Sequence, residues 1–173
     1  MLIVHTGNGK GKTTAALGQA LRAVGEGKRV LMIQFIKGPW KSGEDDAAKL
    51  LSPKFELRKR GKGFVGILGD SLPRKDHEDA ARGALEEARR EIHSGNWDIV
   101  ILDEVNNAVS LELISVGDVL SLLQPTTCKL HALVLTGRDA PLEFIERADI
   151  VTEMREVKHI FNEGVKAKRG IEY

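Results

Sequence analysis

One segment near the start of the sequence restricts the possible folds more than any other. Residues 6–14 read TGNGKGKTT, between a short apolar run, Leu2–His5, and an amphipathic stretch, Lys12–Val24. A glycine-rich loop between a strand and a helix is typical of a phosphate-binding loop (P-loop), whose backbone N–H groups curl around phosphate oxygens. The usual pattern begins with glycine, whereas Thr6 stands at that position. The segment therefore predicts a strand–loop–helix unit that binds a nucleotide, in preference to a plain glycine-rich turn.

Two side chains of this loop have specific expected roles. Lys12 supplies a point charge for phosphate oxygens, and the hydroxyl of Thr13 can ligate Mg²⁺. The expected nucleotide-binding residues are Gly7, Asn8, Gly9, Lys10, Gly11, Lys12, Thr13 and Thr14.

Apolar runs rich in β-branched residues alternate with amphipathic stretches along the rest of the chain, as in a parallel sheet covered by crossover helices. The expected strands are Leu2–His5, Arg29–Ile36, Phe55–Arg60, Ile99–Leu102, Ala132–Thr136 and Ile150–Met154. The expected helices are Lys12–Val24 and Asp76–His93, with shorter ones after Ser115 and Pro141, while Pro39–Asp46 and Gly61–Pro73 are expected to be long loops. A length of 173 residues suits one domain. We predict an α/β fold over residues 1–173, with a mostly parallel six-stranded sheet and helices on both faces.

The fourth expected strand ends in two acids, Asp103 and Glu104, as a Walker B segment does. In such a segment a carboxylate holds Mg²⁺, directly or through water. A solvated acidic turn is the alternative, but the P-loop favours a metal site formed by Thr13, Asp103 and Glu104, in which either acid is the closer ligand. Arg138 follows the next strand in a glycine turn. Its guanidinium suits triphosphate oxygens, although an arginine in a surface turn is ordinarily inert.

Charge and composition exclude several classes of protein. The 26 Lys and Arg nearly balance the 25 Asp and Glu, so we expect neither nucleic acid nor membrane as a partner. No apolar run approaches the roughly 20 residues of a membrane span, and the N-terminus lacks the order of a signal peptide. The single cysteine, Cys128, excludes an internal disulfide and a multi-cysteine metal site. We expect a cytoplasmic protein.

These residues indicate ATP and Mg²⁺ without naming the group that reacts with ATP. A kinase, a hydrolysing switch and an alkyl transferase all fit a P-loop followed by a Walker B segment. A non-catalytic, nucleotide-dependent carrier also fits.

The sequence also resembles a known family over essentially its whole length, the P-loop corrinoid (cob(I)alamin) adenosyltransferases. The matching segments are residues 6–18, 34–40, 63–64, 102–104, 136–138, 148–154, 157–162 and 164–173. The resemblance implies a RecA-like sheet, a homodimer, and attack of Co(I) on the ribose 5′-carbon of ATP with release of triphosphate, in adenosylcobalamin synthesis or salvage. Reduced cobalt is itself a strong nucleophile, so the enzyme has to position it and stabilise the leaving triphosphate. The residues expected to carry the catalysis are Lys12, Thr13, Glu104 and Arg138.

The resemblance further implies an aromatic pair that packs under the corrin and displaces its lower axial ligand. Reduction of Co(II) by a flavoprotein reductase then becomes easier. Phe64 would carry this role here. Many relatives have Trp two places later, where this chain has Gly66, and Trp40 is the candidate replacement, with a packing role as the alternative. Relatives often also carry an N-terminal extension over the site, whereas this sequence opens with the first expected strand.

Overall fold

The computed structural model describes residues 1–67, 69–123, 130–160, 164 and 166–171. Its centre is a six-stranded sheet in the order β3-β2-β4-β5-β1-β6, and every pair of neighbouring strands is parallel. The strands are β1 (Leu2–Thr6), β2 (Val30–Gln34), β3 (Phe55–Lys59), β4 (Ile99–Asp103), β5 (Ala132–Thr136) and β6 (Ile150–Glu153). All six predicted strands are present, and the α/β class with a parallel sheet is confirmed.

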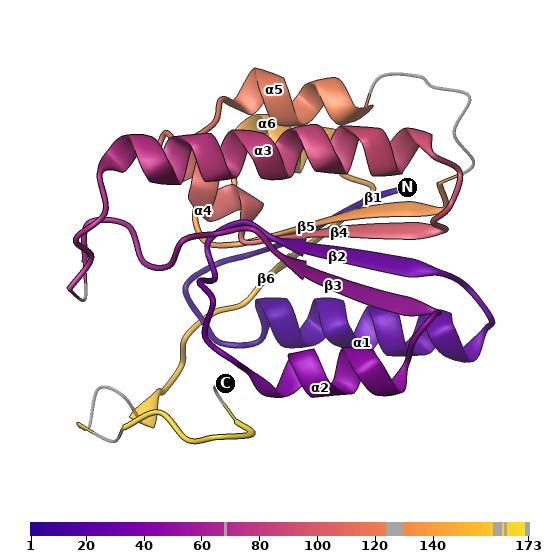
Figure 1. Ribbon diagram of the computed structural model, residues 1–173, viewed down its shortest axis with the longest axis horizontal. Coiled ribbons are helices and arrows are strands. Elements are labelled where there is room, and N and C mark those ends of the chain that lie inside the picture. Colours follow the sequence, from indigo (N-terminus) through magenta and orange to yellow (C-terminus); the bar gives the residue numbers. More distant parts are fainter. Residues whose placement is uncertain (68, 124–129, 161–163, 165, 172–173) are drawn as a thin grey trace.

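Helices cover both faces of the sheet, as predicted (Figure 1). On one face lie α1 (Lys12–Gly25) and α2 (Gly43–Leu50). On the other lie α3 (Arg74–His93), α4 (Val105–Ser110), α5 (Val116–Leu120) with a 3-10 turn at Ser121–Leu123, and α6 (Leu142–Arg147). Among the described residues, no helix is long and apolar enough to cross a membrane.

Strand β2 shows why two layers of helices are needed. Its five residues are all buried, and successive side chains point to opposite faces of a strand. Leu31 and Ile33 belong to the core under α3, whereas Val30 and Met32 belong to the core under α1. A strand that is apolar on both faces therefore requires cover on both.

The sheet also brings the ends of four strands together. Gln34 at the end of β2 is in register with Asp103 of β4, and Thr136 of β5 is in register with His5 of β1. Loops that follow parallel strands gather at this carboxyl edge, where ligands bind in such sheets. The P-loop leaves β1 at the same edge.

Three helices, α2, α3 and α4, differ from the sequence-based expectation. The predicted loop Pro39–Asp46 is wrong in its second half, because α2 begins at Gly43. Ser42 caps that helix: its backbone N–H donates to the carboxylate of Asp45 at 2.7 Å, so a short polar segment can start a helix. The helix α4 was not expected, and α3 begins two residues earlier than predicted, at Arg74. The expectation for Cys128 and parts of the tail, 161–163, 165 and 172–173, lie outside the described residues.

Candidate nucleotide and corrinoid site

The P-loop is closed by its own lysine. The ammonium of Lys12 donates to the carbonyl oxygens of Gly7 and Gly9, at 2.6 and 2.8 Å. Burial lowers the pKa of Lys12, and the nearby Arg138 lowers it further, while the acids around it act in the opposite direction. The lysine is therefore a half-buried cation that lies across the mouth of the loop.

The residue after β6 holds the P-loop in position through a backbone hydrogen bond. The backbone N–H of Gly9 donates to the carbonyl of Met154 at 2.7 Å. A side chain at Gly9 would place its Cβ 2.7 Å from the backbone of Arg155, so only glycine fits this close approach. Thr6, the residue that departs from the usual pattern, accepts a hydrogen bond from the N–H of Ala140 at 3.1 Å. Its hydroxyl thus links the start of the loop to the segment after β5.

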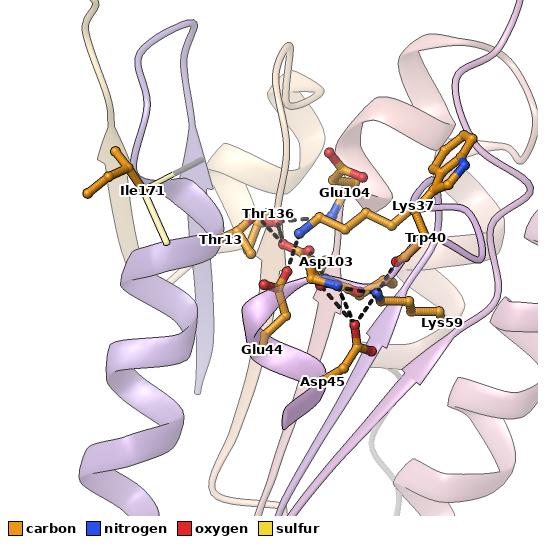
Figure 2. Close-up of polar contacts among 12 residues, drawn as sticks. Thr13, Lys37, Trp40, Glu44, Asp45, Lys59, Asp103, Glu104, Thr136 and Ile171 are labelled. Carbon is orange, nitrogen blue, oxygen red and sulfur yellow. Dashed lines mark hydrogen bonds and ion pairs between the residues drawn. The ribbon is translucent and has the colours of Figure 1, made fainter. Parts of the chain in front are cut away.

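Asp103 is a fully buried carboxylate with three side-chain donors. Two of them, Thr13 and Thr136, are labelled beside it in Figure 2. Its Oδ1 accepts from the hydroxyls of Thr13 at 2.9 Å and Thr136 at 2.7 Å. Its Oδ2 accepts from the amide of Gln34 at 3.0 Å. Because the Thr13 hydroxyl donates its hydrogen bond to Asp103, the lone pairs of its oxygen remain available for a cation.

Glu104, the next residue, has the opposite surroundings. Its backbone adopts a left-handed conformation, with φ of 61°, and its N–H donates to the hydroxyl of Thr136 at 3.0 Å. Within the part of the chain that the structure describes, its Oε2 is buried without a hydrogen-bond partner. Burial, together with the charge of Asp103, raises the pKa of Glu104 to about 7, against the opposing effect of Lys37 and Lys12. A buried carboxylate oxygen that accepts no hydrogen bond is a suitable ligand for a divalent cation.

The donor set suits a cation that is bound together with a nucleotide. Within the described ranges, no group of three or more His, Cys, Asp or Glu side chains is arranged to hold a metal ion. Magnesium is commonly held by one or two protein oxygens, substrate phosphates and water. Thr13 and Glu104, with Asp103 behind Thr13, fit that pattern.

A cavity of about 930 Å³ opens over the P-loop, and α1 and α2 form its apolar side. Of the predicted site residues, those that line it are Asn8, Gly9, Lys10, Gly11, Lys12, Thr13, Thr14, Glu104 and Arg138. Gly7 and Asp103 are not part of this lining. The C-terminal segment also reaches it, because the ammonium of Lys10 donates to the carbonyl of Ile171 at 2.5 Å.

An ion pair between Lys37 and Glu44 contributes to the cavity wall and was not assigned a role by sequence reasoning. Burial disfavours the charge on Lys37, but its hydrogen bond to Glu44 and the nearby Asp103 outweigh burial and raise its pKa. The same hydrogen bond lowers the pKa of Glu44 against the effect of burial. The signal was a lysine three residues after the end of β2, at the carboxyl edge of the sheet, but its partner lies on a helix that the sequence did not predict.

The two predicted corrinoid residues, Trp40 and Phe64, lie side by side outside the cavity lining. Their ring centroids are 6.2 Å apart, with 30° between the ring planes. Trp40 is 62% exposed and Phe64 is 49% exposed, which is unusual for large aromatic side chains. The indole lies over Gly38 and Gly63, where any Cβ would come within 2.7 Å of the ring. The loops after β2 and β3 thus present an aromatic pair at the edge of the sheet that also carries the P-loop.

A family model for the ATP:corrinoid adenosyltransferases BtuR/CobO/CobP matches this chain over residues 1–173. The chain belongs to this family. The corrinoid adenosyltransferase of Escherichia coli strain K12 is 38% identical over 173 residues, which cover 100% of this chain and 85% of that protein. The corrinoid adenosyltransferase CobA of Salmonella typhimurium strain LT2 is 36% identical with the same coverage.

Comparison with a solved structure of low sequence identity supports the fold of this adenosyltransferase family member. The flagellar accessory protein FlaH from Methanocaldococcus jannaschii superimposes with a TM-score of 0.59 at 11% identity, covering 88% of this chain and 69% of FlaH. At this identity the likeness concerns the fold alone. It agrees with the predicted α/β fold.

Proposed function

We propose that this chain transfers the 5′-deoxyadenosyl group of ATP to the cobalt of a reduced corrinoid and releases triphosphate. In this reaction the electron pair of Co(I) forms a bond to the ribose 5′-carbon. The bond from that carbon to the α-phosphate oxygen breaks, and its electron pair leaves with triphosphate. The observation that carries the proposal is the placement of an exposed aromatic pair beside a P-loop cavity in a member of the corrinoid adenosyltransferase family.

The polar side of the cavity supports binding of the triphosphate. We assign the polyanion to the loop amides of residues 7–14 and to the cations of Lys12 and Arg138, which converge on one wall. The ion pair of Lys37 and Glu44 also lines this cavity. Cations that are fixed before the reaction stabilise the negative charge as it develops on the leaving group, without reorganising.

We assign a magnesium ion to Thr13 and Glu104, with Asp103 orienting the threonine hydroxyl. When bound, the ion neutralises charge on the triphosphate. Asp103 already accepts three hydrogen bonds, so we assign it a positioning role and Glu104 the direct contact. The chemistry needs no general base, because Co(I) carries its own electron pair and has no proton to lose.

We assign the flat face of the corrinoid to Trp40 and Phe64. Packing of apolar rings against the lower face of the corrin would displace the axial ligand, and loss of that donor makes Co(II) easier to reduce. In this assignment Trp40 takes the place of the Trp that many relatives carry two positions after Phe64, where this chain has Gly66. A flavoprotein electron donor, a homodimer and a cytoplasmic location remain proposals, as does a single domain over residues 1–173.

Product analysis tests the proposal directly. The protein is incubated with ATP, Mg²⁺ and cobalamin reduced chemically to Co(I), and phosphorus NMR identifies the phosphate product. We expect equimolar adenosylcobalamin and triphosphate. Formation of ADP or phosphate in proportion to turnover would instead support a kinase or ATPase, and tight binding of both ligands without any product would support a carrier.

A further inference from the structure

The loop that carries Phe64 is organised around one carboxylate. Oδ2 of Asp70 accepts the backbone N–H of Gly66 at 2.8 Å, and its Oδ1 accepts the backbone N–H of Leu72 at 3.0 Å. Nε2 of His77, on the first turn of α3, lies 3.0 Å from Oδ2. Since an ionised carboxylate only accepts hydrogen bonds, this ring nitrogen is the donor. Asp70 therefore closes the loop on itself and fastens it to a helix.

The contact between Asp70 and His77 is shielded although the loop around it is exposed. The side chains of His77 and Asp70 are 2% and 8% exposed, respectively. In contrast, Phe64 is 49% exposed, and Ile67 and Leu72 are 59% and 42% exposed. The hydrogen bonds from Gly66, then from Leu72, hold the pKa of Asp70 below its ordinary value, so the carboxylate is charged near neutral pH. A buried charged acceptor with three donors is a strong constraint on a loop.

The geometry connects this constraint to Phe64. Gly66 has φ of 68°, a left-handed conformation in which its N–H points at Asp70, and it lies two residues after Phe64. Val65, between them, packs against the core that α3 covers. On the other side, the carbonyl of Trp40 accepts from the ammonium of Lys59 at 2.7 Å. The backbone of Trp40 is thus held directly by a charged side chain, whereas Phe64 is held indirectly, through the hydrogen bond of Gly66 to Asp70.

We propose that Asp70, fastened by His77, is a positioning residue that holds Phe64 against Trp40 for reaction with the corrinoid. This inference rests on the proposed function, because it assigns the aromatic pair to the corrinoid. Asp70 touches no reacting atom in this proposal. Its loss should affect the step that depends on Phe64, which is reaction from Co(II), and should leave reaction from Co(I) nearly unchanged.

The first experiment replaces the carboxylate while keeping its shape. In Asp70→Asn one acceptor becomes an N–H₂ group, which faces donors and cannot satisfy all three. We expect the rate from cob(II)alamin with a flavin reductant to fall about tenfold or more, because small displacements at a reacting centre are costly. The rate from cobalamin reduced beforehand to Co(I) should stay within about twofold of the parent. Asp79→Asn, an exposed acid on α3, is the matched control and should change neither rate.

A second pair of variants tests the helix contact and remains informative where Asp70→Asn fails to fold. His77→Gln keeps an N–H donor near the position of Nε2, whereas His77→Leu removes it. We expect the glutamine variant to retain the Co(II) rate and the leucine variant to lose it. Equal loss in both variants, or equal loss of the Co(I) and Co(II) rates, would overturn the positioning role and leave a purely structural one.

A double variant separates action through Phe64 from independent damage. If Asp70 acts through Phe64, Asp70→Asn combined with Phe64→Ala is no slower from Co(II) than Phe64→Ala alone. Losses that multiply would refute the inference. Amide hydrogen exchange of the parent and Asp70→Asn proteins, followed at Gly66 and Leu72, reports on the loop without any corrinoid, and unchanged protection in the variant would also overturn it. If the parent forms no adenosylcobalamin but these amides lose protection in Asp70→Asn, the proposed function fails while the loop constraint stands.

Discussion

The two halves of the candidate site are built in opposite ways, although both lie at the carboxyl edge of one sheet. The phosphate half consists of strand ends and the loop after β1, and its central acid, Asp103, is fully buried with three donors. The aromatic half consists of two loops beyond β2 and β3, and its rings are about half exposed. A polyanion needs fixed dipoles in a dry setting, where they act most strongly. A flat macrocycle needs an accessible apolar surface, which only an exposed loop provides.

The largest expected effect lies in the phosphate half. Lys12→Ala removes a cation that supports no core contact, so we expect turnover to fall at least about 100-fold while the protein stays folded. Calorimetric titration measures the affinity for ATP, a turnover assay measures the loss of activity, and thermal unfolding shows whether the variant is folded. Lys28→Ala, a half-buried lysine outside the cavity lining, is the control. Unchanged ATP affinity together with unchanged turnover would contradict the P-loop assignment.

The aromatic half should respond differently, and this difference tests the comparison most directly. Phe64→Ala is expected to bind ATP normally and to adenosylate cobalamin that has been reduced beforehand to Co(I). Its rate from Co(II) should fall about tenfold for each ~59 mV by which the potential of the bound cobalt drops. Spectra of bound cob(II)alamin with ATP should show four-coordinate cobalt in the parent and less of it in the variant. A purely five-coordinate spectrum in the parent would refute the role of Phe64.

Glu104→Gln sharpens the contrast between the two adjacent acids. If Glu104 is the direct ligand, the magnesium concentration for half-maximal turnover should rise about tenfold, with little change in corrinoid binding. Glu112→Gln is a close control, because Glu112 is exposed and also has a left-handed backbone, with φ of 57°. Superimposable magnesium titrations of Glu104→Gln and the parent would show that the metal is held elsewhere.

The smallest effect is a pH dependence of stability without metal or nucleotide. The pKa of Glu104 rises on folding from its ordinary 4.5 to about 7, so between these values the folded state binds more protons than the unfolded state. The free energy of unfolding must then fall as pH rises through this window and level off above it. Across this pH window we expect the free energy of unfolding of the parent to fall by about 1 to 3 kcal/mol more than that of Glu104→Gln. Parallel curves from urea unfolding at pH 4.5 to 8 would show that the carboxyl is not perturbed.

Sequence patterns predicted those parts of the molecule whose structure depends on residues that are contiguous in the chain. The P-loop was predicted because a glycine-rich turn between a strand and a helix is contiguous in the chain, and Asp103 and Glu104 because they end an apolar strand. The ion pair of Lys37 with Glu44 was not predicted, since it depends on where a short capped helix packs. The role of Asp70 was also missed, because an acid in a polar loop has no pattern that reveals three donors. The helix α2 itself was not predicted, for the same reason as its ion pair.

The strand order has a consequence for the synthesis of this protein. Strand β1 is made first, yet both of its neighbours, β5 and β6, are made last, with Leu2 facing Leu133 and Ile3 facing Ile150. The N–H of Gly9 in the P-loop then pairs with Met154. The ribosome must therefore synthesise β5 and β6 before β1 can pair in the sheet, and contacts this distant in sequence slow the search for the native state. Until then the glycine-rich loop lacks its backbone partner at Met154, so we expect nucleotide to stabilise the protein only late in its synthesis.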